Sequence, residues 1–122
     1  MTAALTREAA LVHDFYRLVD AGDVPALVAM FTEDTTYHRP GYPAVVGHEG
    51  VAHFYTSVRV IKEGEHRVES VVVEGDQVAV RGSFEGVLRD GTRTSLRYAD
   101  FFTLAADGRF GKRETFFFAP LV

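Results

Sequence analysis

The sequence predicts an α+β fold: a cone-shaped, strongly curved antiparallel β-sheet with three N-terminal helices packed on its concave side. Apolar residues of the first half recur at helical spacing, whereas those of the second half alternate with polar residues as in strands. Short turns that contain glycine separate the strand segments. Helices followed by an antiparallel meander form a helical layer on one face of a sheet. The length of 122 residues predicts one domain over residues 1–122.

The first predicted helix begins after Thr6, which can cap it, and runs to about Ala21. Its apolar residues share one face: Leu11, Val12, Phe15, Leu18 and Val19. Gly22 then ends the helix, because glycine adopts the left-handed conformation of a C-cap without steric cost.

Two shorter helices and a short strand complete the first half. Asp23 can cap a second helix, which carries Pro25 in its first turn and extends through Phe31. Residues 35–37 predict a short strand, which ends at the Pro-Gly-Tyr-Pro segment 40–43. A third helix is expected over residues 49–60, with an apolar set that should be buried: Val51, Phe54, Tyr55 and Val58.

Four longer strands are expected at residues 68–73, 78–88, 94–104 and 109–118. Three glycines lie inside these strands, where glycine often marks a bulge or a bend: Gly82, Gly86 and Gly111. A bent sheet closed by three helices encloses a cone, which is either packed solid or leaves an apolar pocket.

Asp100 is the most informative residue, because it shares one strand face with large, mostly apolar side chains. Tyr98 and Phe102 are its nearest neighbours on that face. Burial among aromatic rings disfavours a charged carboxylate, so Asp100 is a candidate for donating a hydrogen bond or exchanging a proton. The alternative is a buried ion pair with Arg113 or Arg97, in which Asp100 stays ionised and acts as a base or an anchor. Arg113 is also suited to bind a substrate carboxylate or enolate.

Histidines supply the candidate partners for Asp100. His38 is the best candidate base, because imidazole titrates near neutrality, and a loop histidine facing water is the alternative. His53 is more typical of a surface or half-buried helical residue. His48 and His53 do not form a zinc motif, because histidines five residues apart point about 140° apart on a helix.

Composition limits the partners and the compartment. The net charge is −4 and no cluster of basic residues occurs, which is not typical of nucleic-acid binding. The chain has no cysteine and no apolar run long enough to span a membrane, and its first residues do not predict a signal peptide. We expect a soluble, cytoplasmic protein without cofactor or metal, which binds a small apolar ligand and neither nucleic acid nor membranes.

Three segments carry a family resemblance: residues 21–34, the Gly-His-Glu-Gly segment 47–50 with its following helix, and Asp100-Phe101-Phe102 with the next hairpin. In this order they resemble the NTF2-like superfamily, which includes nuclear transport factor 2, ketosteroid isomerases and SnoaL-type polyketide cyclases. The resemblance covers nearly the whole chain and implies the cone-shaped fold. It implies no single reaction, since the fold carries enzymes, binding modules and transport factors.

The resemblance to ketosteroid isomerases is partial. It aligns Asp100 with the protonated aspartic acid that stabilises an oxyanion in that family, and Tyr55 with a supporting tyrosine. Arg39 stands where that family has its proton-abstracting aspartate. Phe15 stands where it has an oxyanion-binding tyrosine, with Tyr16 one residue out of register. We therefore expect no steroid isomerase activity.

Two other chemistries of the superfamily fit in part. SnoaL-like cyclases, by resemblance, rely on one strand carboxylate with a histidine nearby, which Asp100 with His38 or His53 would match. Epoxide hydrolases of this fold use two aspartates and an arginine around a water. Arg113 would supply that arginine, but no second aspartate has a convincing place.

The sequence thus favours acid–base chemistry of isomerase, cyclase or hydrolase type on a small, apolar, carbonyl-bearing substrate in a hydrophobic pocket. Asp100 would give or take the proton, His38 or a tyrosine would be its partner and Arg113 would stabilise charge. The candidate substrate-binding residues are aromatic: Phe15, Tyr16, Tyr37, Tyr55, Tyr98, Phe102 and Phe117. The alternative is a non-catalytic module of the same fold that binds a small ligand or forms dimers.

The apolar run at residues 116–118 points to a further partner. Phe117 is expected to face the pocket, and Phe116 and Phe118 the opposite side of the sheet. An uncovered apolar sheet face usually binds a partner. Since the resembled family commonly dimerises through its sheet, a homodimer is expected.

Overall fold

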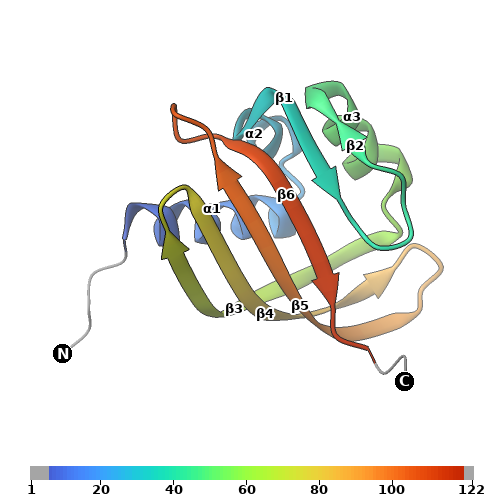
Figure 1. The fold of residues 1–122 in the computed structure, drawn as a ribbon. Coiled ribbons are helices and arrows are strands. Elements are labelled where there is room, and N and C mark those ends of the chain that lie inside the picture. The colour runs from blue at the N-terminus through green and yellow to red at the C-terminus, as the bar shows by residue number, and fades with distance from the viewer. Residues whose placement is uncertain (1–5, 120–122) are drawn as a thin grey trace.

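The computed structural model describes residues 6–119, which form helices packed on one six-stranded sheet (Figure 1). The helical elements are α1 (Arg7–Ala21), α2 (Val24–Ala29), α3 (Gly47–His53) and a π-helical turn η1 (Phe54–Val58). The strands are β1 (Phe31–His38), β2 (Val45–Val46), β3 (Ile61–Glu74), β4 (Gln77–Leu88), β5 (Arg93–Leu104) and β6 (Phe110–Phe117). The predicted α+β class is confirmed. The start of the chain, where the sequence predicts no signal peptide, lies outside the described residues.

The caps of the first two helices form as predicted. The Thr6 hydroxyl accepts a hydrogen bond from the backbone N–H of Ala9 at 3.0 Å, and Gly22 ends α1 with φ at 72°. The Asp23 carboxylate accepts from the N–H of Ala26 at 3.2 Å. Helix α2 ends before Phe31, which the sequence wrongly assigns to it, because Phe31 pairs with Phe110 in the sheet.

The strands around α3 are longer than predicted. Strand β1 begins at Phe31 instead of residue 35, and β3 begins at Ile61 instead of residue 68. The third helical segment therefore ends at Val58, and its last turn is π-helical. Charged residues dominate the start of β3 and hide its alternation, but pairing with β4 along its whole length holds it in the sheet.

The sheet order is β2-β1-β6-β5-β4-β3. The predicted antiparallel meander from β3 to β6 is confirmed, and β1 extends it by pairing in parallel with β6. This parallel pair joins segments more than 70 residues apart, for which a local turn gives no signal. It brings Tyr37 opposite Arg113.

Glycines make room for aromatic side chains on the inner face of the sheet. A Cβ atom at Gly86 would lie 2.6 Å from the Phe84 ring, and one at Gly82 would lie 2.7 Å from the Tyr98 hydroxyl. At Gly111 the register between β5 and β6 shifts, which matches the bulge expected there.

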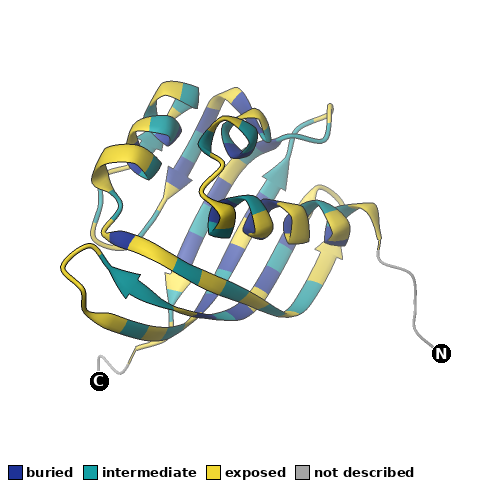
Figure 2. Cartoon of the chain, turned by 180° about the vertical axis from the view of Figure 1, so that it is seen from behind, coloured by how far each residue is buried: buried dark blue, intermediate teal, exposed yellow. Residues whose placement is uncertain are grey.

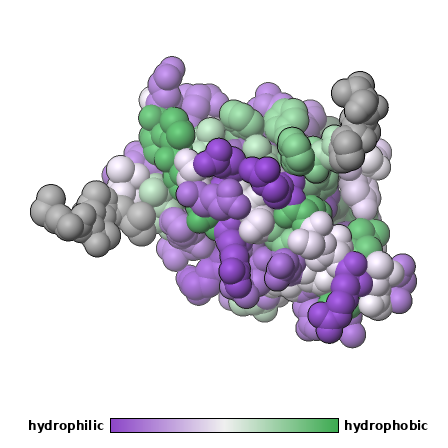
Figure 3. All heavy atoms as spheres, turned by 90° about the horizontal axis from the view of Figure 1, so that it is seen from below, coloured by the Kyte–Doolittle hydropathy of each residue, from purple (hydrophilic) through white to green (hydrophobic). Residues whose placement is uncertain are grey.

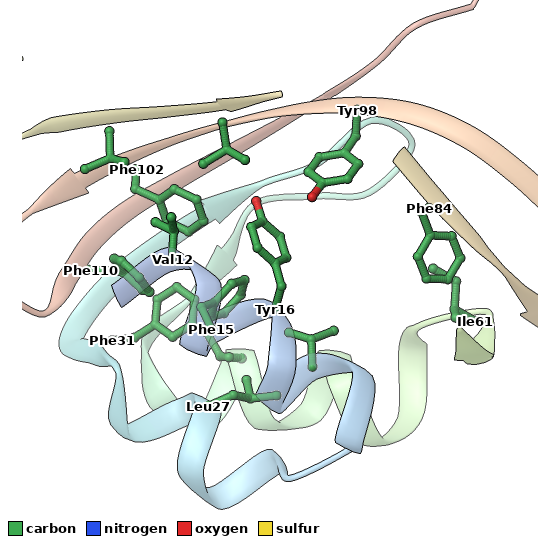
Figure 4. Packing of buried hydrophobic residues seen from close by; sticks show 14 residues of the cluster. Val12, Phe15, Tyr16, Leu27, Phe31, Ile61, Phe84, Tyr98, Phe102 and Phe110 are labelled. Atoms are coloured by element: carbon green, nitrogen blue, oxygen red, sulfur yellow. The ribbon is translucent and has the colours of Figure 1, made fainter. Parts of the chain in front are cut away.

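The core lies between α1 and the concave face of the sheet. Figure 2 shows the helices in front of the sheet, with buried residues where the two layers face each other. Phe15 of α1 is at its centre, with edge-on ring contacts to Phe31, Phe102 and Phe110 at centroid distances of 5.5–5.7 Å (Figure 4). Within residues 6–119, no helix is both long and apolar enough to cross a bilayer.

Hydrophobic side chains also gather on the outer face of the sheet. Viewed from below, the molecule carries hydrophilic side chains across its centre and separate hydrophobic groups around them (Figure 3). The outer apolar patch of the sheet consists of Val72, Phe101, Phe116 and Phe118, all of them exposed. The rings of Phe101 and Phe116 are in contact at 5.7 Å between centroids.

Candidate active site

Asp100 is completely buried on the inner face of β5 and accepts three side-chain hydrogen bonds. Its Oδ2 accepts from the Tyr16 hydroxyl at 2.5 Å and from Nη2 of Arg113 at 3.0 Å. Its Oδ1 accepts from the Thr115 hydroxyl at 2.5 Å. The strand register sets this arrangement, because Thr115 of β6 lies opposite Asp100. All three partners donate to the carboxylate, so both of its oxygens are engaged in hydrogen bonds.

Arg113 is the ion-pair partner of Asp100 and is itself only 4 % exposed. Its Nη1 donates to the Tyr55 hydroxyl at 2.8 Å, and its guanidinium lies 4.4 Å from the Tyr37 ring centroid. Burial is the largest single influence on Arg113 and opposes its charge, but the Asp100 carboxylate together with the surrounding tyrosines holds the arginine pKa well above its ordinary value. The sequence offered Arg113 and Arg97 as ion-pair partners of Asp100. The structure pairs Asp100 with the buried Arg113, whereas Arg97 is exposed.

A second acid–base pair joins α1 to β3. Nδ1 of His66 is hydrogen-bonded to Oδ1 of Asp20 at 2.5 Å, and the backbone N–H of His66 donates to Oδ2 of Asp20 at 2.8 Å. The imidazole stacks on the Tyr16 ring at 5.1 Å between centroids. Burial lowers the pKa of His66, despite the opposing effect of the Asp20 carboxylate. The imidazole is therefore neutral at neutral pH.

Tyr98 carries a free hydroxyl beside these groups. The side chain is 5 % exposed, and its oxygen has no hydrogen-bond partner within residues 6–119. Figure 4 shows the hydroxyl groups of Tyr98 and Tyr16 directed toward each other. Burial, and then the Asp100 carboxylate, raises the pKa of Tyr98 above its ordinary value, so the phenol keeps its proton.

These groups surround one small cavity. Asp100, His66, Tyr98 and Arg113 line it, and its volume is about 20 Å³. A site needs roughly 10–15 Å³ to hold one water molecule, so the cavity admits about one water as it stands. A larger ligand requires side chains at its margin to move.

The aromatic candidates divide into two groups. Tyr55, Tyr98 and Phe117 line the cavity. Tyr16 is connected to the cavity by its hydrogen bond to Asp100. The other three rings are buried behind Arg113, and its guanidinium lies over each of them: Phe15, Tyr37 and Phe102.

His38 is not part of this site. Its side chain is exposed, whereas the adjacent Tyr37 faces the interior, so the pleat of β1 directs His38 away from Asp100. The proposal of His38 as the partner of Asp100 is corrected accordingly. His53 is also exposed, and His48 is hydrogen-bonded to the backbone oxygen of Phe31 at 2.6 Å.

Sequence reasoning missed several residues of the site: Asp20, Arg39, Arg59, His66 and Thr115. His66 gave no signal because the strand that carries it was not predicted. Its alternation with the half-buried Gly64 and Val68 was the available indication. Asp20 resembled a surface residue at the end of a helix.

Comparison with known proteins identifies the family. The model of the SnoaL-like domain matches residues 12–111, which include Tyr16, His66 and Asp100. The chain belongs to the SnoaL-like domain family. No curated protein sequence matches it.

Solved structures support the same fold for this SnoaL-like protein. It is similar to SalBIII, an epoxide hydrolase/cyclase-like enzyme of pyran ring formation in the polyether salinomycin, with 26% identity and a TM-score of 0.80 over 92% of this chain and 91% of that one. A ketosteroid isomerase-like protein from Erwinia carotovora atroseptica is also 26% identical, with a TM-score of 0.69 and coverage of 91% and 93%. An NTF2-like protein from Burkholderia pseudomallei has 19% identity and a TM-score of 0.84, covering 93% and 92%.

Replacing Asp100 tests the buried ion pair. Asp100→Asn leaves the Arg113 charge buried without a counter-charge, so we expect the free energy of unfolding to fall by about 3–5 kcal/mol in urea denaturation. The double variant Asp100→Asn/Arg113→Met carries no unpaired charge and should recover part of this loss. A double variant as unstable as the sum of both single variants would contradict the coupling.

The titration of His66 tests its environment. In an NMR titration we expect His66 to have a midpoint below the ordinary value of about 6.5 for a histidine. Asp20→Asn removes the carboxylate that raises the pKa of His66, so it should lower the midpoint further. Because the folded state binds this proton less tightly than the unfolded chain does, stability should fall as the pH drops below about 6.5. A His66 midpoint at or above about 6.5 would contradict the lowered pKa.

Proposed function

We propose that this SnoaL-like protein is an enzyme that applies acid–base chemistry, without a cofactor, to a small carbonyl-bearing molecule. The reaction class is isomerase, cyclase or hydrolase. One observation carries the proposal. The neutral His66, oriented by a carboxylate, lines the same cavity as the buried ion pair, and so does Tyr98 with its free hydroxyl. Titratable groups in such an arrangement are typical of catalytic sites.

His66 is the proposed base. When its Nδ1–H donates to Asp20, the lone pair of Nε2 is available to take a proton from the substrate. Within the described residues Nε2 has no hydrogen-bond partner. Asp100 is less suited to this role, since three donors engage its oxygens. Asp100 instead holds Tyr16 and Arg113 in place.

Tyr98 is the proposed donor to the substrate carbonyl oxygen. Loss of a proton from the neighbouring carbon moves negative charge onto that oxygen, and a preorganised phenol stabilises it. The proton held by His66 then returns at another carbon, which completes an isomerisation. The Arg113 cation adds to the stabilisation of this charge.

The likeness to SalBIII supports the enzymatic class. SalBIII, which is described as an epoxide hydrolase/cyclase-like enzyme, is 26% identical to this chain, and the alignment covers more than nine-tenths of both chains. Cyclisation and epoxide opening also need one group that takes a proton and one that donates to oxygen, which His66 and Tyr98 would supply.

One observation favours the non-catalytic alternative. The cavity of about 20 Å³ is far smaller than the roughly 300–1,000 Å³ of typical ligand sites. If no ligand opens it, the polar groups serve to bind water and the domain acts as an interaction module.

Hydrogen exchange separates these functions without knowledge of the natural substrate. We expect the protein to accelerate exchange of α-hydrogens for deuterium in a panel of small cyclic and aryl ketones in D2O, measured by NMR. His66→Gln should reduce the rate about 100-fold or more, and Tyr98→Phe by a similar factor. The control His53→Gln changes an exposed histidine and should have no effect. A rate that stays unchanged in His66→Gln, or no acceleration of any ketone, would refute the proposed base.

We also propose that two copies of this chain associate through the outer apolar patch. Val72, Phe101, Phe116 and Phe118 are exposed, and the rings of Phe101 and Phe116 are in contact. Contact with water disfavours such apolar surface. Light scattering after gel filtration should give a dimer, and Phe116→Arg should give a monomer. A Lys62→Arg control, outside the patch, should remain dimeric. A monomeric wild type would rule out this interface.

A further inference from the structure

Four buried donor groups surround the cavity without a hydrogen-bond partner in the described part of the chain. They are Nε of Arg39, Nε of Arg59, Nε of Arg113 and the hydroxyl of Tyr98, and all four residues line the cavity. A buried donor without an acceptor costs about 1–3 kcal/mol, so native proteins contain few of them. Their concentration around one cavity indicates that an acceptor group belongs there.

The charge of the lining indicates which kind of acceptor. Three guanidinium groups face one carboxylate, Asp100, which is already paired with Arg113. Within residues 6–119, neither Arg39 nor Arg59 forms an ion pair. Burial lowers the pKa of Arg59, and the nearby Arg39 and Arg113 lower it further, in keeping with uncompensated positive charge.

Aromatic rings hold these two arginines in position. The Arg39 guanidinium lies 5.1 Å from the Phe117 ring centroid, and its Nη1 donates to the Tyr37 hydroxyl at 3.1 Å. The Arg59 guanidinium lies 5.3 Å from the Tyr55 ring centroid. Cation–π contacts orient a cation without neutralising it. Both arginines are therefore fixed at the cavity and still able to bind an anion.

A groove beside the cavity supplies room for the rest of a ligand. Its volume is about 360 Å³, and it shares four residues with the cavity: Val19, Tyr55, Arg59 and Ile61. The other charged residues of the groove are Asp20, Lys62, Glu63 and Arg89. Because Arg59 lines both spaces, it lies between them. A ligand whose body occupies the groove would reach the cavity at Arg59.

We propose that the ligand is a small organic carboxylate with an apolar body, its carboxylate held between Arg39 and Arg59. The two oxygens of a carboxylate match the planar fork of a guanidinium. Tyr98 remains free to donate to a carbonyl oxygen of the same molecule. This inference rests on the proposed function, because it names the substrate class of the same site.

Calorimetry with 2-naphthoate and its neutral analogue 2-naphthamide tests the inference. We expect the wild type to bind naphthoate at least about tenfold more tightly than naphthamide, which corresponds to about 1.4 kcal/mol. Arg39→Met and Arg59→Met should each weaken naphthoate binding by at least about tenfold, since each removes one guanidinium and keeps the apolar stem.

Three controls make the outcome decisive. Arg67→Met changes an exposed arginine of β3 and should leave naphthoate affinity unchanged. Melting temperatures of the ligand-free Arg39→Met and Arg59→Met variants should be no lower than that of the wild type, since each variant loses a buried unpaired donor. Naphthoate binding by a wild type that exchanges no α-hydrogens would support this inference and refute only the proposed function.

Three results would overturn the inference. The first is equal affinity of the wild type for the acid and the amide, and the second is undiminished naphthoate affinity in both arginine variants. The third is no binding of either compound up to about 10 mM, which would mean that water alone satisfies the buried donors.

Discussion

The buried ion pair of Asp100 and Arg113 is the interaction on which the rest of this structure depends. A guanidinium and a carboxylate inside an apolar core are costly unless they pair with each other and hydrogen-bond to further groups. Tyr16, Tyr55 and Thr115 supply such groups from α1, η1 and β6, while Nε of Arg113 has no partner within residues 6–119. The pair therefore links the helical layer to the sheet at one point of the cone.

The candidate site grows outward from this pair. Tyr16 is fixed by its hydrogen bond to Asp100, and His66 stacks on the Tyr16 ring. Asp20, one turn further along α1, holds the imidazole. Charge is thus balanced at the centre and left unbalanced at the margin, where Arg39 and Arg59 have no counter-ion within residues 6–119. A binding site needs side chains that a rigid scaffold holds in place and that are still free to bind a ligand, and Arg39 and Arg59 meet this condition.

Much of the fold followed from local chemistry. Thr6, Gly22 and Asp23 mark helix ends through hydrogen bonds and backbone conformations that involve only near neighbours. The meander from β3 to β6 followed from alternation and glycine turns. The start of β3 did not follow, because most residues directly after Ile61 are charged or exposed and only pairing with β4 makes them a strand. Because that part of β3 was not predicted, His66 was not recognised as a candidate site residue.

The sequence by itself determined that Asp100 lies among aromatic side chains on the inner face of a strand, because the pleat alternates faces with a period of two. It left Arg113 and Arg97 as candidate counter-ions, since the alternation does not decide the face of Arg113. Only the tertiary structure decided what meets there. The parallel pairing of β1 with β6 brings Tyr37 beside Arg113, and the packing of α1 on β3 joins Asp20 to His66. These contacts connect residues far apart in the chain, so no local pattern encodes them. The same pleat that buries Tyr37 turns His38 to solvent, because β1 continues to His38, one residue beyond the predicted strand.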